Sequence, residues 1–599
     1  MKNFVVPAIL VVSVVMIGAT VSSNDPWPQW GHDARHSGFS PVAGQAPTVM
    51  LADIVYDPFV PQAQAESGGD LLAHYQAPLV SGNSVYMEFK TGSYTSCPTP
   101  GSWQNGDICG PNAWNSMTWN ERRLDWHNGQ LETVWTFESD WKPEWNGTFG
   151  LAGWEPVFHP VLSHGFLYVP GFGGALWKVN IQTGAAVAWI TPFGTTHVQD
   201  TFVSSPLTAD AQGNIYYNVL KLQDPHLSNP WFASDIKGAW LVKVAPDGGF
   251  TMATYKSLVP GAPAADDFNC PGTFFDLTTL PWPPSPSAVA PGFVCGSQRP
   301  GVNIAPAVAP DGTIYTISRG HFNSMVAYLV AVNPDLTPKW QASLQNRLTD
   351  GCGFLVPIAP PDNPNQPNSC RVGSNLGVDP TTNAPGSGSI IDQASSTPTV
   401  LPDGSILVGV TTNYGFARGE LFKFSRHGEF LGNYNFGWDS TAAVRAHDGT
   451  YSIVLKDNHY GGIGNYCFDP TSPICAPRPN GPYFITQLNA NLVPEWQFRD
   501  TTTESCQRNP DGSVTCIPNT HPNGFEWCIN APAFDVNGNV YVNSEDGNMY
   551  VIDPHGNLVG NIFTNLAIGA AYTPLSLGPD GKIYTQNDGQ LFVVGDGSN

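Results

Sequence analysis

The sequence predicts an all-β fold, an eight-bladed β-propeller, and three observations carry this prediction. Glycine (62) and proline (55) are abundant among the 599 residues, and 12% are aromatic, which is typical of short strands joined by tight turns. A unit built around an Asp-Gly or Asn-Gly turn recurs along the whole chain. Most copies carry a second hairpin signal, so each contains four short antiparallel strands, the composition of a propeller blade.

Each copy begins with a small residue and a proline, continues through a glycine turn and ends in a β-branched and aromatic run, as in Ala77–Tyr86. The turn glycines of the eight copies are Gly82, Gly165, Gly213, Gly312, Gly404, Gly449, Gly538 and Gly581. Three intervals between successive glycines are 48, 45 and 43 residues, the length of a bare four-stranded blade, and the longer intervals hold insertions. Two separate four-bladed domains are the alternative, but no linker divides the chain.

These boundaries give three regions. We expect a signal peptide at 1–23, an N-terminal segment at 24–76 and the propeller at 77–599. The blades are expected at 77–140, 154–194, 201–260, 303–344, 395–438, 440–500, 529–564 and 570–598. The last copy ends after three strands, so residues 47–56 are expected to supply its fourth strand and to close the ring without an open edge.

The N-terminus indicates export. Lys2 precedes an apolar run over Phe4–Gly18, and small residues follow at 19–23, which is the layout of a cleaved secretory signal. A membrane anchor is the alternative, although a spanning helix needs about 20 apolar residues. We therefore expect a secreted or periplasmic protein that does not span the membrane after cleavage.

Eleven cysteines in an exported chain indicate disulfide bonds. They form local clusters: Cys97 with Cys109, Cys270 with Cys295, Cys352 with Cys370, Cys467 with Cys475, and the triplet Cys506, Cys516 and Cys528. Four local pairs and one pair within the triplet would leave one thiol over. None has the CxxC spacing of zinc ribbons or redox sites, so we interpret the cysteines as structural.

Charge excludes one class of partner. Lys and Arg number 25 against 48 Asp and Glu, a net charge of -23, and no basic patch offsets it. Such a surface repels phosphate backbones, so nucleic-acid binding is not expected.

Two segments carry a family resemblance. Residues Trp27–Gly38 resemble the segment that opens many PQQ-like eight-bladed propellers, and Leu176–Trp189, with its turn at Thr183 and Gly184, is similar to the tryptophan-docking repeat of quinoprotein dehydrogenases and BamB-type assembly factors. The resemblance implies the fold but not one function, since the superfamily contains both cofactor-dependent dehydrogenases and non-catalytic scaffolds. The chain lacks the adjacent cysteine pair usual in soluble alcohol-oxidising members, so a PQQ or metal cofactor has no specific motif in this sequence. It also lacks a lipid-anchor cysteine near the expected cleavage point, which weakens the resemblance to the assembly factors.

The long connections fall on one face of the expected ring. Turns within the first hairpins are minimal, whereas the loops between second and third strands and the blade-to-blade crossings are long: 94–118, 221–237, 457–482, 139–156, 258–302, 345–396 and 501–529. Every cysteine lies in or beside these segments. Long loops in a compact fold usually carry function, so we expect a ligand or partner surface there; a cap that shields the core is the alternative.

Candidate residues follow from this placement, although no catalytic or cofactor-binding residue can be assigned. Histidines that could hold copper or iron near the channel are His159, His197, His321 and His459, with His74, Asp200 and Asp439 nearby. Candidates for the ligand face are Lys90, Arg319, Arg418 and Asp457, with His226 in an equivalent loop. Carboxylates that could pair for acid–base cleavage of polysaccharides are Glu155, Glu526, Glu545 and Asp546.

The expected function is non-catalytic binding of an extracellular or periplasmic protein, small molecule or glycan. One alternative is an oxidoreductase with a quinone or a His-coordinated metal at the channel mouth. A second alternative is a carbohydrate-active enzyme.

Overall fold

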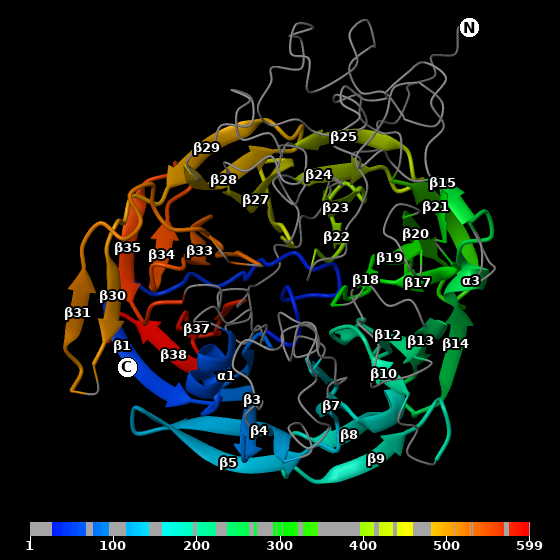
Figure 1. Ribbon diagram of the computed structural model, residues 1–599, viewed down its shortest axis with the longest axis horizontal. Coiled ribbons are helices and arrows are strands. Elements are labelled where there is room, and N and C mark those ends of the chain that lie inside the picture. The colour runs from blue at the N-terminus through cyan, green and yellow to red at the C-terminus, as the bar shows by residue number, and fades with distance from the viewer. Residues whose placement is uncertain are drawn as a thin grey trace, which may run out of the picture.

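A computed structural model of the chain shows sheets arranged in a ring around a central axis (Figure 1). It describes residues 27–67, 76–94, 116–142, 158–195, 200–222, 236–262, 269–271, 292–294, 296–301, 303–320, 327–344, 396–411, 419–434, 440–458, 481–509, 511–527, 529, 531–567 and 574–597. Eight sheets of four or five strands in this part of the chain are the blades, which confirms the predicted all-β, eight-bladed propeller.

The first four blades are described from the innermost strand outward. Blade 1 contains β2 (Leu79–Ser81), β3 (Ser84–Gly92), β4 (Met117–His127) and β5 (Gln130–Glu138). Blade 2 contains β6 (Val161–Ser163), β7 (Phe166–Pro170), β8 (Leu176–Asn180) and β9 (Ala186–Ile190). Blade 3 has a split inner strand, β10 (Thr201–Val203) and β11 (Thr208–Ala209), then β12 (Ile215–Leu222), β13 (Ile236–Val244) and β14 (Phe250–Thr254). Blade 4 repeats that plan with β17 (Gln298–Pro300), β18 (Ala307–Val308), β19 (Ile314–Gly320), β20 (Tyr328–Val332) and β21 (Pro338–Ser343).

The remaining blades follow in chain order. Blade 5 contains β22 (Thr399–Val400), β23 (Ile406–Thr411), β24 (Gly419–Phe424) and β25 (Phe430–Tyr434). Blade 6 contains β26 (Ala443–His447), β27 (Thr450–Asn458), β28 (Tyr483–Asn489) and β29 (Pro494–Arg499). Blade 7 contains β32 (Ala533–Phe534), β33 (Val540–Asn543), β34 (Asn548–Ile552) and β35 (Leu558–Phe563). Blade 8 contains β36 (Ser576–Leu577), β37 (Ile583–Asn587), β38 (Gln590–Gly595) and, antiparallel to β38, the N-terminal β1 (Val49–Val55).

In the part of the chain that the structure describes, few elements lie outside the blades. They are helices α1 (Val60–Ser67) and α3 (Tyr255–Leu258), the 3-10 turn η4 (Phe172–Gly174), and two small hairpins, β15 (Asn269–Pro271) with β16 (Gly292–Val294) and β30 (Ser505–Arg508) with β31 (Val514–Ile517). No helix in the described ranges has both the length and the apolar character needed to cross a membrane. The expected signal at 1–23 lies outside these ranges.

The burial of the strands and the chemistry of the turns explain why these sequences fold as blades. All seven residues of β19 are buried, because both faces of a blade pack against neighbouring blades. The outermost β29 alternates exposed and half-buried residues, because one edge of each blade meets solvent. Asp311 Oδ1 accepts the Thr313 N–H (2.9 Å) at the first-hairpin turn of blade 4, and Gly312 supplies the positive φ of 81°.

Tryptophans on outermost strands dock onto the following blade. In blade 1, the Trp135 Nε1–H donates to the Ile181 carbonyl (2.9 Å), and a Cβ at Gly184 would lie 2.8 Å from the Trp135 ring. Trp340 makes the same contact from blade 4, donating to the Arg426 carbonyl (3.0 Å). The tryptophan-docking resemblance thus corresponds to an observed contact between blades, in which only glycine leaves room for the ring.

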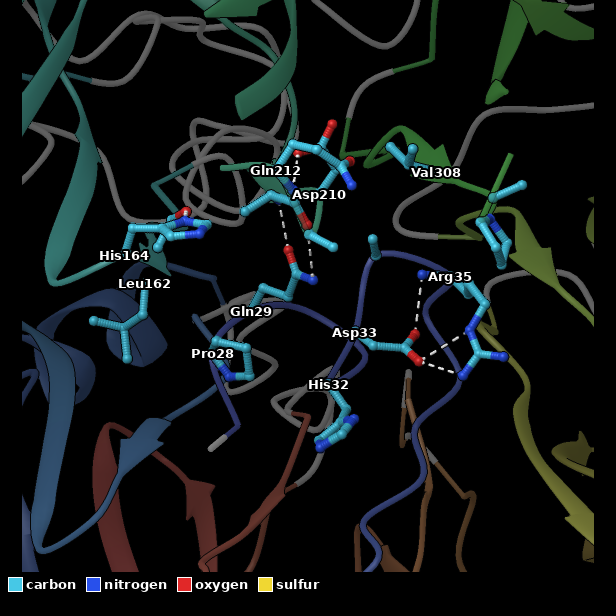
Figure 2. Close-up of a pocket in the computed structure, with 16 residues that line it drawn as sticks. Pro28, Gln29, His32, Asp33, Arg35, Leu162, His164, Asp210, Gln212 and Val308 are labelled. Carbon is cyan, nitrogen blue, oxygen red and sulfur yellow. Dashed lines mark hydrogen bonds and ion pairs between the residues drawn. The ribbon is translucent and has the colours of Figure 1, made fainter. Parts of the chain in front are cut away.

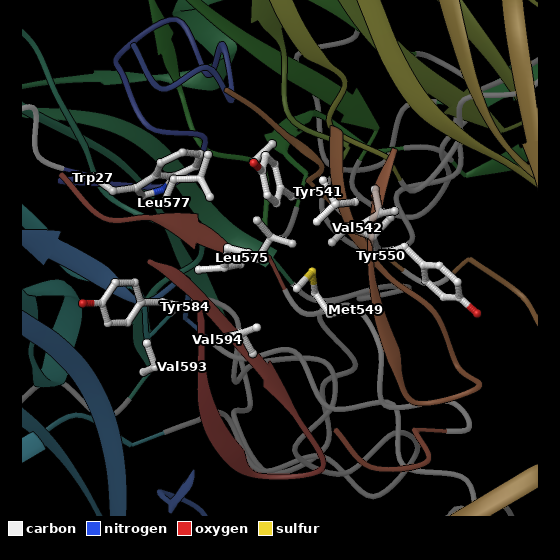
Figure 3. Close-up of a cluster of buried hydrophobic side chains, with 14 of the residues drawn as sticks. Trp27, Tyr541, Val542, Met549, Tyr550, Leu575, Leu577, Tyr584, Val593 and Val594 are labelled. Atoms are coloured by element: carbon white, nitrogen blue, oxygen red, sulfur yellow. The ribbon is translucent and has the colours of Figure 1, made fainter. Parts of the chain in front are cut away.

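A large apolar cluster fills the junction between blades 7 and 8 (Figure 3). Tyr541 and Met549 of blade 7 and Leu575 and Tyr584 of blade 8 are buried there, together with Trp27 from the N-terminal segment. The N-terminal segment therefore belongs to the core of the ring.

Candidate functional site

Residues 27–48, here called the axial segment, hydrogen-bond to all eight blades in turn. Its contacts from blade 1 to blade 8 are Trp27 N to Val80 O (2.7 Å), Leu162 N to Pro28 O (2.8 Å), Ala209 N to Gln29 Oε1 (2.7 Å), Val308 N to Ala34 O (2.6 Å), Val400 N to Arg35 O (2.9 Å), Val444 N to Ser37 O (2.7 Å), Phe534 N to Gly38 O (2.8 Å) and Gln45 N to Gly581 O (2.8 Å). The bonded blade residues lie at or near the first-hairpin turns. The segment therefore lines the axis on the face that carries those turns, here called the turn face; the opposite face is the loop face.

Two buried histidines support this arrangement. His36 places Nδ1 2.9 Å from the Pro398 carbonyl and Nε2 3.3 Å from Thr208 Oγ1. His159, a metal candidate, accepts the Ala77 N–H at Nε2 (3.0 Å) and places Nδ1 3.0 Å from the Pro160 carbonyl. Burial lowers the pKa of each to about 4, so both rings are neutral at pH 7. Each ring has both nitrogens engaged by groups of the chain itself.

A pocket of about 510 Å³ lies between the axial segment and the first-hairpin turns of blades 2, 3 and 4 (Figure 2). Asp33 Oδ2 accepts hydrogen bonds from Nη2 (2.7 Å) and Nε (3.1 Å) of the Arg35 guanidinium. Burial raises the pKa of Asp33, but the charges of Arg35 and His32 and the hydrogen bonds outweigh it and hold that pKa below its usual range.

The other polar groups of this pocket also bind the chain itself. The Gln29 amide pairs with the Ala209 backbone, and Asp210 accepts bonds from Asn214 and from the Tyr216 hydroxyl (2.8 Å). The Asp33–Arg35 pair thus lies within the axial segment and the Asp210 bonds within blade 3, and the neutral Gln29 amide joins the two.

Four of the eight equivalent positions on the loop face carry a charged residue. In blades 1 to 7 each such position lies five residues beyond the strand partner of the residue that contacts the axial segment: Lys90, Phe172, Leu220, Arg319, Thr411, Asn458 and Glu545. In blade 8 the corresponding residue is Asp588, five residues beyond Ile583, the partner of Leu577. Cations occupy blades 1 and 4, whereas anions occupy blades 7 and 8. Lys90, Arg319 and Glu545 are all buried.

Lys90 forms a buried ion pair. Its Nζ lies 2.6 Å from Asp57 Oδ2 and 5.9 Å from the centre of the Trp119 ring. On the same sheet Glu88 lies opposite Glu121, both fully buried, and Gln76 Nε2 donates to Glu121 Oε1 (3.0 Å). Burial raises the pKa of Glu121 to about 8 against the opposing effect of Gln76, so this carboxyl is protonated at pH 7.

The other described ligand-face candidates are also buried between blades. Arg319 lies opposite Arg299 in the β17–β19 register. Asp457 Oδ2 accepts bonds from the Tyr434 hydroxyl (2.6 Å), Thr486 (3.1 Å) and Gln497 (3.2 Å). Lys90, Arg319 and Asp457 thus lie in three separate blades, 1, 4 and 6, and the structure does not bring them together in one site.

Three residues proposed for acid–base chemistry, Glu526, Glu545 and Asp546, lie near one another through backbone contacts at the boundary of blades 6 and 7. The Glu545 N–H donates to the Glu526 carbonyl (3.1 Å), and Asp546 accepts the Tyr550 hydroxyl. Asp500, which sequence reasoning missed, accepts the Ser544 hydroxyl (2.6 Å). Burial and the Asp546 charge raise the pKa of Asp500 to about 7, and burial also raises that of Asp546. Two carboxyls that disfavour each other's ionisation can hold a proton at neutral pH.

This cluster forms the base of residues 501–527, here called the 6–7 insertion. Its hairpin β30–β31 is pinned by the Cys506–Cys516 disulfide, as expected for one pair within the triplet. Arg508 anchors it to blade 7 through the carbonyls of Phe563 (2.7 Å) and Thr564 (3.0 Å). Glu504 lies beside both sulfurs. Since these are bonded to each other, neither is a thiolate ligand.

Several candidates lie outside the described residues: His197, His321, His459, Arg418, His74, His226, Asp439 and Glu155, and the side chains of the other nine cysteines. Asp200 is described and lies 3.4 Å from Lys221 Nζ.

Comparisons with known proteins concern the fold. No protein-family model and no curated protein matches the chain. Among solved structures it is similar to a europium-containing methanol dehydrogenase (11% identity, TM-score 0.47, covering 94% of this chain and 89% of that one). It is similar to quinohemoprotein alcohol dehydrogenase from Comamonas testosteroni (11%, 0.47, covering 96% and 81%) and to BamB from Moraxella catarrhalis (11%, 0.37, covering 85% and 98%). The eight blades and the docked tryptophans are those of an eight-bladed β-propeller fold.

Proposed function

We propose that this chain is an exported binding module that recognises a protein, small-molecule or glycan partner on its loop face. One observation carries the proposal: the axial segment bonds to every blade on the turn face, whereas the long connections all leave from the loop face. A rigid ring that closes one face with its own chain leaves the opposite face for recognition. The signal-like N-terminus supports a secreted or periplasmic setting for such a partner.

The joined ends of β3 and β4 allow a direct test. The Ser93 N–H donates to the Ser116 carbonyl (3.0 Å), so an Asn-Gly turn can replace residues 94–115 without opening blade 1. The matched turn-face variant combines His164→Ala with Gln212→Ala, two exposed residues. Each protein is immobilised and exposed to extracellular and periplasmic extract. Loss of specific retention only in the loop-face variant supports the proposal, and loss only in the turn-face variant contradicts it.

Elemental analysis and a visible spectrum of unreconstituted protein distinguish the oxidoreductase alternative from the binding module. Stoichiometric copper or iron, or a quinone absorption band, would favour that alternative.

Acid–base chemistry is the second candidate, and the Asp500–Asp546 pair is the observation that favours it. A carboxyl whose pKa lies near 7 is suited to general acid–base catalysis. Glycan cleavage that is abolished by Asp500→Asn or Asp546→Asn in folded protein would support an enzyme in place of a binding module.

A further inference from the structure

We infer that the free edge of β31 binds an extended, basic segment of a partner protein by strand addition. This inference rests on the proposed binding function and specifies the kind of partner. The 6–7 insertion is one of the long loop-face connections, and its hairpin stands outside the ring beside β35 and β1 (Figure 1).

The backbone of β31 offers outward-facing hydrogen-bonding groups. The Asn509 N–H donates to the Ser513 carbonyl (2.8 Å) across the turn, so hydrogen-bonded pairs alternate from there along the hairpin. Val514 and Cys516 therefore occupy non-hydrogen-bonded positions facing Arg508 and Cys506. The 4.0 Å separation of the Cys506 and Cys516 Cα atoms agrees with this assignment. The N–H and carbonyl groups of both residues point away from β30.

These groups are accessible. All four residues of β31 are exposed, and the side chains of Val514 and Ile517 are 45% and 62% exposed. In the described ranges β31 pairs with β30 alone. Natural proteins usually protect such edges with lysines, bulges or covering loops, and β31 contains no lysine.

The edge is also held in place before any partner arrives. The disulfide fixes the register of the hairpin, and Arg508 binds it to blade 7 through two carbonyls. Ordering a strand in advance lowers the entropic cost of adding another strand to it.

Charge selects a basic partner. Glu504 and Asp511 are exposed, and hydrogen bonds from Ser513 hold the pKa of Asp511 below its usual range. The single cation within 501–520 is Arg508, which is turned toward blade 7. The net charge of -23 adds a long-range attraction for lysine-rich and arginine-rich segments.

Val514→Pro tests the inference because it removes an outward N–H and none of the bonds to β30. Val514→Ala is the matched control, since it trims the side chain and keeps the N–H. The probes are a ten-residue peptide alternating lysine with valine and its glutamate counterpart, titrated by calorimetry into the full-length disulfide-bonded protein. We expect the lysine peptide to bind the wild-type protein and to bind Val514→Pro roughly fivefold to tenfold more weakly. Its affinity for Val514→Ala should be close to that for the wild-type protein. The glutamate peptide should not bind.

Equal binding to Val514→Pro, or no binding of the lysine peptide to wild-type protein, would overturn the inference. Mass spectrometry of the Cys506–Cys516 peptide and the circular dichroism spectrum show that each variant is folded. Retention of an extract partner by Val514→Pro as strongly as by wild type would refute the β31 site while leaving the binding module intact. Absence of specific retention by both the 94–115 replacement and wild type would refute the proposed function itself.

Discussion

Two pairs of buried titratable groups, His36 with His159 and Glu121 with Asp500, are held neutral in opposite protonation states. Near the axial segment, His36 and His159 have pKa values lowered to about 4, so they are neutral because they have lost a proton. Toward the loop face, Glu121 and Asp500 have pKa values raised to about 8 and 7, so they are neutral because they have kept one. These four groups thus avoid buried charge, but acid destabilises the folded chain through the two histidines and alkali through the two carboxyls.

The sign of each group's contribution to folding stability depends on whether the folded or the unfolded chain binds more protons at that group. Between pH 6.5 and 4 the unfolded chain binds more protons at the two histidines, so their contribution to stability falls as pH falls. Between pH 4.5 and 8 the folded chain binds more protons at Glu121, so that contribution falls as pH rises. The two ranges overlap between pH 4.5 and 6.5, where the contributions oppose each other, so maximum stability is expected near pH 6.

The axial segment should be the most sensitive region. Gly38 has φ 60°, and a Cβ there would lie 2.8 Å from the Pro532 carbonyl oxygen. Gly38→Ala combines left-handed strain with a backbone clash and should cost about 4 kcal/mol in urea unfolding at pH 6. Gly82→Ala is the control, because Gly82 has φ 58° and open space around the added Cβ, and it should cost about 1 kcal/mol. Equal costs would show that Gly38 is not held against blade 7.

Glu121→Gln should abolish the largest loss of folding stability at alkaline pH. The neutral amide has no proton to release, so the variant should exceed wild-type stability by about 3 kcal/mol at pH 9 and match it at pH 5. Exposed Glu138→Gln serves as the control and should change neither value. The free energy of unfolding across this pH range measures both, and a constant difference at all pH values would show that Glu121 is ionised in the folded chain.

His36→Ala should reduce the loss of stability at acid pH. It leaves the Pro398 carbonyl and the Thr208 hydroxyl without their His36 contacts and should cost about 2 kcal/mol at pH 7. The loss of stability between pH 6.5 and 4 should also become shallower, since one buried neutral histidine is gone. Exposed His164→Ala should leave the slope unchanged; an unchanged slope in His36→Ala would contradict the burial of a neutral ring.

The disulfide hairpin should show the smallest global effect. The double substitution Cys506→Ala and Cys516→Ala removes a cross-link between residues 10 positions apart, in a hairpin outside the ring. The free energy of unfolding should therefore change by less than about 0.5 kcal/mol, while hydrogen exchange at β31 accelerates. A large global loss would show that the 6–7 insertion is part of the ring's cooperative core.

The repeat made the architecture predictable because each blade is a local unit with its own turn signals. Cysteine clustering likewise anticipated the Cys506–Cys516 pair. The axial segment's path could not be predicted, since backbone hydrogen bonds such as Val400 N to Arg35 O leave no mark on side-chain patterns. The sequence places Lys90 in the loop between the second and third strands, whereas it lies within β3, and its partner Asp57 belongs to a distant segment. Asp500 was missed because its burial depends on blade 7, which follows the insertion.

Hydrogen exchange with a bound partner tests the central claim most directly. Wild-type protein with and without its captured partner is exchanged, and turn-face peptides covering 162–166, 209–213 and 309–313 are compared with loop-face peptides covering 87–92, 454–458 and 541–546. We predict added protection at the loop-face peptides and in the 6–7 insertion, with the turn-face peptides unchanged. Protection confined to the turn-face peptides would contradict the account.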